Sequence, residues 1–332
     1  MDFTVVICSK DSVISLPAVS LRSDLEGTNQ LTLTNGILRL KKEKKALILA
    51  HNYQRPEIQD IADYVGDSIE LSRRAMEEND ARIILFSAVD FMAENAVILN
   101  PDKKVLLPSE GARCPMAQML TVGEIRRWKA KYPKLPVVLY VNTLAEVKAE
   151  CDICCTSANA VEVIKSVDSD TLLFGPDRNL ALYVTKQTKK RIIPIPERGF
   201  CPTHVLFQKS DVDFWKQKHP EAPVIVHPEC TLEVQAAADY VGSTSQMCRY
   251  AQQLDSKGFI IGTESGIIHR LKKENPEKEF ILAYDGAVCP NMKLNTLERL
   301  YLALKEEKYQ VNVPKPVAEK ARKALDNMFS LA

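Results

Sequence analysis

The segment ADYVGDS at residues 62–68 returns almost unchanged as ADYVGST at residues 238–244. The two copies begin 176 residues apart, and CDICCTS at residues 151–157 lies about halfway between them. Each copy has the pattern of a short β-strand followed by a helix with a Ser or Thr at its N-cap. A repeat of this length exceeds that of a solenoid and suits a small domain. The sequence therefore predicts three related units.

Apolar strands and helical patterns alternate around each copy of this segment. The first strand of each unit is ALILA at residues 46–50, VVLY at residues 137–140 or VIV at residues 224–226, and three further strands follow it with helical patterns in between. Alternation at this spacing is typical of parallel sheets covered by helices. We therefore predict the α/β class, with three homologous αβα domains whose four-stranded parallel sheets form a pseudo-threefold triangle around a central cavity.

The composition and the repeat together predict five segments. Residues 1–35, which are rich in Ser, Thr and Asn, should form an irregular N-terminal arm. The three α/β domains should span residues 36–130, 131–217 and 218–294, and C-terminal helices that serve for packing should span residues 295–332.

Each predicted domain delivers one Cys-Pro dipeptide from the loop after its last strand. The three cysteines are Cys114 in EGARCPMA, Cys201 in ERGFCPTH and Cys289 in DGAVCPNM, at intervals of 87 and 88 residues. The chain has nine cysteines, and its start lacks the pattern of a secretory signal. In a reducing compartment cysteines act as ligands or nucleophiles more often than as disulfides. We therefore expect three thiolates that meet at one point.

Three converging thiolates could hold zinc or an iron–sulfur cluster. Alternatively, the three cysteines lie in turns and share no ligand. Zinc ligands usually occur as closely spaced pairs such as C-x₂-C, and these cysteines do not. Three cysteines on a four-iron cluster would leave one iron without a protein ligand, and that iron could act as a Lewis acid. Cys151-x-x-Cys154, with Cys155 beside it, is a competing metal or redox pair, but Cys154 and Cys155 fall on a predicted buried strand.

Polar residues follow the predicted strands at their carboxyl ends, where open α/β sheets bind ligands. Ser and Thr at helix starts could bind a phosphate or carboxylate, or could simply cap their helices. His227 and Glu229 alternate along one strand end, which suits binding and general acid/base catalysis, and His204 should lie near Cys201. The site residues that this pattern predicts are His51, Tyr53, Ser68, Asn142, Ser157, His227, Glu229, Ser243 and Thr244.

The composition argues against several function classes. The net charge of +1 gives no reason to expect nucleic acid or an anionic membrane as a partner, and no apolar run approaches the ~20 residues of a membrane span. Neither a G-x-G-x-x-G nor a Walker motif is present, which speaks against dinucleotide or ATP binding. The alternatives to a phosphate-handling enzyme are an iron–sulfur hydro-lyase for another small hydroxy acid and an iron–sulfur sensor.

A series of motifs in fixed order resembles the quinolinate synthase family. The motifs are HNYQRPEIQDIADYVGDS, SEGARCPMA, YVNT, TSANA, GFCPTH, HPEC, GSTS, GTESG and CPNMKLNTLERL, from about residue 40 to residue 305. The resemblance implies a transferase of NAD biosynthesis that condenses iminoaspartate with dihydroxyacetone phosphate to quinolinate, phosphate and water. It also implies a 4Fe–4S cluster with three cysteine ligands, a cytoplasmic location and a functional link to L-aspartate oxidase.

The resemblance also implies roles for the residues that match these motifs. Cys114, Cys201 and Cys289 should ligate the cluster. Tyr53, His227 and Glu229 should take part in catalysis. Substrate contacts should come from His51, Ser68, Tyr140, Asn142, Ser157, His227, Glu229, Ser243 and Thr244. Some family members carry a C-x-x-C-x-x-C run around the third ligand, whereas this chain has Ala283, Gly286 and Met292 at the neighbouring positions, so a redox switch based on that run should be absent.

Overall fold

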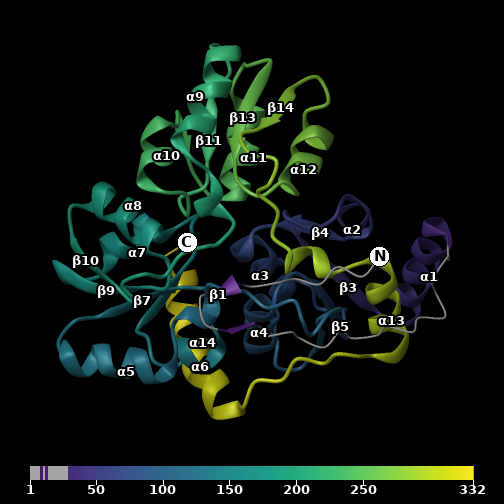
Figure 1. Ribbon diagram of the computed structural model, residues 1–332. Coiled ribbons are helices and arrows are strands. Elements are labelled where there is room, and N and C mark those ends of the chain that lie inside the picture. Colours follow the sequence, from purple (N-terminus) through teal and green to yellow (C-terminus); the bar gives the residue numbers. More distant parts are fainter. Residues whose placement is uncertain (1–7, 10–11, 14–28, 332) are drawn as a thin grey trace.

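The computed structural model describes residues 8–9, 12–13 and 29–331. In this part of the chain three four-stranded sheets, each entirely parallel, lie at the corners of a triangle (Figure 1). The α/β class and the three αβα units that the repeat predicts are therefore confirmed.

The three sheets share one strand order, in which the second strand lies at an edge, followed by the first, the third and the fourth. The first sheet consists of β4 (Tyr64–Gly66), β3 (Ala46–His51), β5 (Ile83–Ser87) and β6 (Lys104–Leu106). The second consists of β8 (Ile153–Cys155), β7 (Val137–Tyr140), β9 (Thr171–Gly175) and β10 (Arg191–Pro194). The third consists of β12 (Tyr240–Val241), β11 (Val224–Val226), β13 (Gly258–Gly262) and β14 (Glu279–Leu282).

Helices connect the strands of each sheet and cover its faces. The first unit has α2 (Pro56–Ile61), α3 (Ser68–Glu77) and α4 (Asp90–Leu99); the second has α6 (Ala145–Lys148), α7 (Ala160–Ser166) and α8 (Arg178–Thr188); the third has α10 (Leu232–Ala237), α11 (Thr244–Gln253) and α12 (Ile267–Glu274). The units are joined by α5 (Val122–Lys131) and α9 (Lys209–Lys218), and the described chain also contains α1 (Gln30–Glu43), α13 (Leu297–Glu306), α14 (Lys315–Phe329) and the antiparallel pair β1 (Cys8–Ser9) and β2 (Ser12–Val13).

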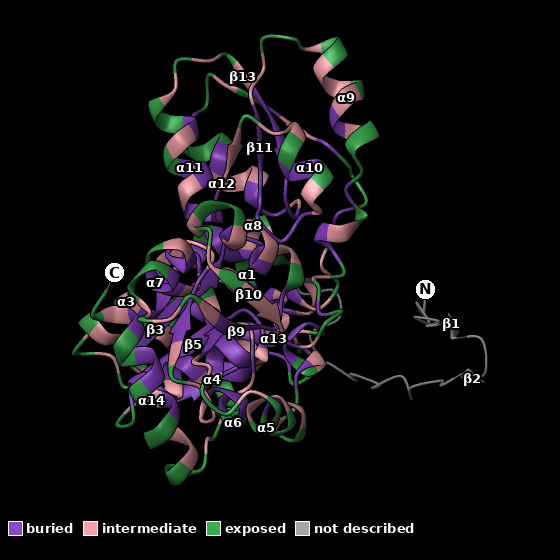
Figure 2. Cartoon of the chain, turned by 90° about the vertical axis from the view of Figure 1, so that its left-hand side faces the viewer, coloured by how far each residue is buried: buried purple, intermediate pink, exposed green. Residues whose placement is uncertain are grey.

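The burial of the first strand shows how a parallel sheet is held on both faces. In β3, Leu47 and Leu49 point into a large cluster that also contains side chains of the other two sheets, whereas Ile48 points into a separate cluster with α1 and α13. The shared cluster includes Leu325 of α14, and α14 packs against β8, α6 and α4. Buried residues accordingly concentrate in the strands and on the inner faces of the helices (Figure 2). One common core thus holds the three units together.

The expectation of an irregular arm over residues 1–35 is wrong for its last part. Helix α1 begins at Gln30, because the side chain of Asn29 accepts a hydrogen bond from the backbone N–H of Leu31 at 3.0 Å and caps the helix. Leu33 and Ile37 lie at helical spacing on its buried face. Apart from β1 and β2, the rest of the predicted arm lies outside the described residues.

In two helices the observed N-cap lies one or two residues away from the predicted one. The cap of α3 is Asp67, whose carboxylate accepts the first N–H groups of the helix, and Ser68 is the first helical residue. The cap of α7 is Asn159, two residues after Ser157. Ser243 caps α11 as predicted. The strand-then-helix pattern located these helix starts, but several neighbouring residues could serve as the cap.

Candidate active site

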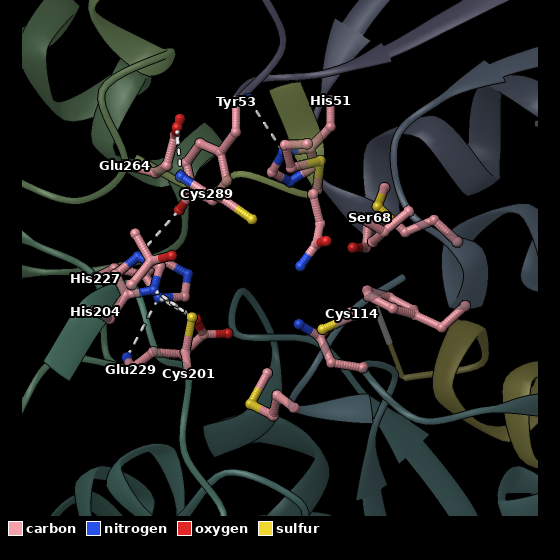
Figure 3. A pocket seen from close by; sticks show the side chains of 18 of the residues that line it. His51, Tyr53, Ser68, Cys114, Cys201, His204, His227, Glu229, Glu264 and Cys289 are labelled. Carbon is pink, nitrogen blue, oxygen red and sulfur yellow. Dashed lines mark hydrogen bonds and ion pairs between the residues drawn. The ribbon is translucent and has the colours of Figure 1, made fainter. Parts of the chain in front are cut away.

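The polar residues that follow the strands of all three sheets surround one cavity of about 140 Å³ (Figure 3). In each sheet the chain runs from the first strand to an edge and then crosses to the third strand on the other side. Ligands of open α/β sheets bind at such a reversal, beyond the carboxyl ends of the strands. In this chain the carboxyl ends of the strands of all three sheets face the same cavity.

Cys114, Cys201 and Cys289 all line this cavity, and Figure 3 shows their sulfur atoms pointing into it from three sides. A short 3₁₀ turn begins three residues after each cysteine, and the first backbone N–H of that turn bonds to the thiol. Burial raises the pKa of all three thiols, and the backbone N–H groups oppose this rise. Each loop therefore delivers one sulfur to the cavity, and its backbone N–H offsets part of the cost of charging that sulfur.

The donor set fits a cluster better than it fits a single ion. A single ion needs its ligand atoms within a few ångströms of one another, and Cys201, His204 and Glu229 meet that condition at 4.8 Å. The three cysteine sulfurs form no such compact group within the described ranges. A multi-iron cluster binds each thiolate through a different iron, so its ligands stand farther apart. Three converging thiols with N–H support satisfy that requirement.

His51 and His227 occupy equivalent turns after the first strands of two sheets. The backbone N–H of Tyr53 donates to Nδ1 of His51 at 3.1 Å, and the backbone N–H of Glu229 donates to Nδ1 of His227 at 3.3 Å. Each ring therefore carries its proton on Nε2, as a neutral donor. Burial lowers the pKa of both histidines to about 3, which keeps them neutral near pH 7.

Glu229 lies between two buried donors. The hydroxyl of Tyr140 donates to Oε1 at 2.7 Å, and Nδ1 of His204 lies 2.8 Å from Oε2. Burial by itself would raise the pKa of the Glu229 carboxyl, but His227, His204 and these hydrogen bonds hold it below its usual range. The carboxylate is thus present in its ionised form.

A chain of hydrogen bonds links Glu229 to Tyr53. Nε2 of His204 lies 2.8 Å from the hydroxyl of Thr263, and the hydroxyl of Tyr53 bonds to the same Thr263 oxygen. His204 also lies beside a cysteine, with Nδ1 3.1 Å from Sγ of Cys201, as its position in the sequence predicts. His204 therefore joins a cysteine loop to two residues of the site.

The remaining predicted residues divide into those that face the cavity and one that does not. Ser68, Asn142, Ser157 and Thr244 line it, and Tyr140 does so as well. The side-chain oxygen of Asn142 is buried and has no hydrogen-bond partner among the described residues. Ser243 is absent from the lining, because its hydroxyl bonds to Asp67 at 3.0 Å and caps α11.

The cysteines around residue 151 lie away from the cavity. Cys154 and Cys155 are fully buried in β8, as the strand pattern predicts. Sγ of Cys151 lies 3.8 Å from Sγ of Cys154, and neither lines the cavity.

Sequence reasoning did not find several residues that line this cavity or bond to the residues that do. Thr263 and Glu264 follow the third strand of their sheet, and Asp90 and Asp177 occupy the equivalent positions in the other two units. The carboxylates at positions 90, 177 and 264 recur every 87 residues, which is close to the interval between the cysteines. The three carboxylates therefore have a periodic signal in the sequence, like that of the cysteines.

Comparisons with known proteins point to one family. A family profile described as "Quinolinate synthetase A protein" matches residues 35–330. A quinolinate synthase of Thermotoga maritima is 54% identical over 299 residues, which covers 90% of this chain and 99% of that protein. Quinolinate synthases of Alkaliphilus metalliredigens and Pyrococcus horikoshii are each 52% identical, over 91% of this chain and 99% and 100% of their own lengths.

In the described part of the chain no helix has both the length and the apolar character needed to cross a membrane. The profile covers most of the chain, and three relatives share more than half of their residues with it over nearly their whole length. The chain therefore belongs to the quinolinate synthase family.

Proposed function

We propose that this chain condenses iminoaspartate with dihydroxyacetone phosphate to form quinolinate, phosphate and water. Membership of the quinolinate synthase family supports the reaction. The observation that carries the proposal is the convergence of Cys114, Cys201 and Cys289, one from each unit, on a cavity rich in polar residues.

We infer that these three cysteines hold a 4Fe–4S cluster. When bound, the cluster supplies an iron without a protein ligand, which acts as a Lewis acid in the dehydration. The backbone N–H at each thiol and the shared cavity that the three cysteines line support this ligand set.

The anionic groups of the substrates are assigned to two helix starts. Ser68 and Thr244 are the first residues of α3 and α11, which are equivalent helices of two units. Ser243 bonds to Asp67, so the two caps lie against each other and both helix starts meet at the cavity. The positive end of each helix favours a phosphate or carboxylate there. In this proposal Ser243 acts by holding α11, and Thr244 makes the contact.

The neutral rings and amide at the cavity wall orient the substrates. His51 and His227 present an Nε2–H, and that of His227 reaches Ser157 at 3.2 Å. The unpartnered oxygen of Asn142 can accept a hydrogen bond from a substrate amine or hydroxyl. Tyr140, held by Glu229, shapes the wall between them.

Proton transfer is assigned to Glu229 and Tyr53, with His227 beside them. Glu229 is ionised and lines the cavity, so it is the carboxylate that can accept a proton there and later return it. Burial raises the pKa of Tyr53 far above its usual value, so its hydroxyl keeps its proton and acts as a donor. The two groups lie at opposite ends of the hydrogen-bonded chain through Thr263 and His204.

Iminoaspartate must be supplied by an enzyme that oxidises aspartate, and we propose a functional link to L-aspartate oxidase. The cysteine usage fits a reducing compartment, and we propose the cytoplasm as the location.

Replacing single cysteines tests the ligand set. After anaerobic reconstitution with ferrous iron and sulfide, the unmodified chain should contain four irons and form quinolinate from the two substrates. Cys114→Ser, Cys201→Ser and Cys289→Ser should each lose the cluster and the activity, because each removes one of three ligands. Iron and sulfide analysis, visible absorption and product chromatography are the measurements.

Cys154→Ser is the matched control, because this buried cysteine lies outside the cavity and should leave the cluster and activity intact. Loss of iron from Cys154→Ser, or retention of a full cluster by Cys201→Ser, would refute the ligand set. A fully loaded chain that forms no quinolinate would refute the reaction.

A further inference from the structure

A carboxylate accepts a hydrogen bond from the backbone of each cysteine in the proposed ligand set. In all three units this carboxylate follows the third strand and accepts a hydrogen bond from the N–H of the cysteine itself. The bonds are Asp90 Oδ1 with Cys114 N at 3.0 Å, Asp177 Oδ2 with Cys201 N at 3.2 Å, and Glu264 Oε1 with Cys289 N at 3.0 Å. Figure 3 shows Glu264 directed at Cys289.

The same carboxylates are anchored at the start of the following helix. Their second hydrogen bonds come from Phe91 N at 2.9 Å, Leu180 N at 2.7 Å and Gly266 N at 2.7 Å. A backbone bond runs back in each unit, to the carbonyl oxygen two residues before the cysteine. These are Asp90 N to Ala112 O, Arg178 N to Gly199 O and Ser265 N to Ala287 O, at 2.8 to 3.0 Å. Each cysteine loop is thus fastened to its sheet at two points.

Burial of these carboxylates costs folding free energy, which their hydrogen bonds must offset. Asp177 and Glu264 are 0% exposed, and Asp90 is half-buried. An ionised carboxylate that is removed from water destabilises the fold unless hydrogen bonds or a cation satisfy it. Glu264 has Lys293 at 3.0 Å, whereas Asp177 relies on backbone N–H groups. A carboxylate thus occurs at the same place beside the cysteine in all three units, and in two of them it is fully buried.

We propose that Asp90, Asp177 and Glu264 are positioning residues that set the three cysteine loops at the separation a cluster requires. This inference rests on the proposed ligand set of Cys114, Cys201 and Cys289. The carboxylates touch the backbone of the ligand and act through it. Outer partners that orient metal ligands typically change metal affinity 10- to 100-fold when they are removed.

The chain contains a second set of carboxylates that serves as an internal control. Asp63, Asp152 and Asp239 each accept a backbone N–H from the first strand of their sheet, at 2.7 to 2.8 Å. They are exposed, do not line the cavity and do not touch the cysteine loops. A variant in this set breaks the same kind of bond at a place where no ligand depends on it.

Asp177→Ser separates the positioning role from helix capping. Asp177 is the N-cap of α8, and Ser is about as good a cap as Asp, but its shorter side chain cannot also reach the N–H of Cys201. We expect this variant to fold like the unmodified chain and to release iron to a ferrous chelator about 10- to 100-fold faster. Glu264→Gln keeps one acceptor oxygen of the two and should show a smaller increase in the same direction.

The measurements are iron release under anaerobic conditions, visible absorption of the cluster and the thermal unfolding midpoint of the iron-free chain. Asp152→Ser should release iron at the unmodified rate. If Asp177→Ser and Glu264→Gln both release iron at that rate, with unchanged absorption, the positioning role is refuted while the ligand set stands. If the unmodified chain takes up no cluster, the proposed function itself is refuted. If Asp177→Ser fails to fold, Glu264→Gln decides.

Discussion

At the scale of single residues, Glu229 is the side chain whose surroundings are most specific. It is 3% exposed, and it accepts hydrogen bonds from Tyr140 and His204 on its two oxygens. A buried carboxylate with this support keeps its charge and its orientation. In the proposed reaction this support would let Glu229 take a proton from the substrate without reorganisation.

Glu229→Gln should slow turnover by ~10²–10⁴ while the cluster content stays unchanged, because the amide has the same size but cannot accept a proton. Steady-state rates, compared at equal iron content, test this expectation. Glu233→Gln is the matched control, because Glu233 is exposed and lies on α10 outside the cavity. Turnover of Glu229→Gln within a few fold of the unmodified rate would remove its role in proton transfer.

At the scale of elements, the loop that carries Cys201 passes close to the turn after β9. A Cβ atom on Gly199 would lie 1.8 Å from the carbonyl oxygen of Pro176, so no larger residue fits without movement of the backbone. The N–H of Arg178 donates to the carbonyl of Gly199 at this crossing. The glycine thus permits the approach that brings Cys201 to the cavity.

Gly199→Ala should therefore displace this loop. We expect a loss of about 1–3 kcal/mol in the free energy of unfolding, as for other overpacked sites, together with fewer than four irons per chain. Gly123→Ala is the control, since the nearest atoms to its Cβ would lie at 4.0 Å in an open position on α5. Equal stability and full iron content in both variants would contradict the close crossing.

At the scale of the whole molecule, α14 ties the C-terminal end of the chain to two of the three units. It packs against α4 of the first unit and against β8 and α6 of the second. Its buried face includes Ala321, Leu325 and Met328. The relative placement of two cysteine loops therefore depends on a helix that carries no site residue.

Leu325→Ala should lower the free energy of unfolding by ~2–5 kcal/mol, because it leaves a cavity in the shared core. Chemical unfolding of the iron-free chain measures this effect. Lys323→Ala, on the exposed side of the same helix, should change it by no more than ~0.5 kcal/mol. A Leu325→Ala chain as stable as the control would mean that α14 contributes little to holding the units together.

The sequence by itself determined the fold class, the threefold repeat and the three cysteines that face one cavity. These follow from local patterns: apolar strands at regular intervals, helix starts after them and one Cys-Pro in each unit. Such local patterns predict the structure well, because neighbouring residues in the chain determine where a buried strand or a capped helix forms. The boundaries of the other predicted segments and the roles of the individual site residues remain predictions.

Only the tertiary structure decided which side chains meet. Several contacts of the site join residues from different units. These are Tyr53 with Thr263, Ser243 with Asp67, and His204 with Glu229. Such contacts depend on how three sheets pack around one core, which sets distances that no spacing in the chain encodes. The carboxylates that hold the cysteine loops are the clearest case, because their period was visible in the sequence but their bonds appear only when the loops fold back onto the helices.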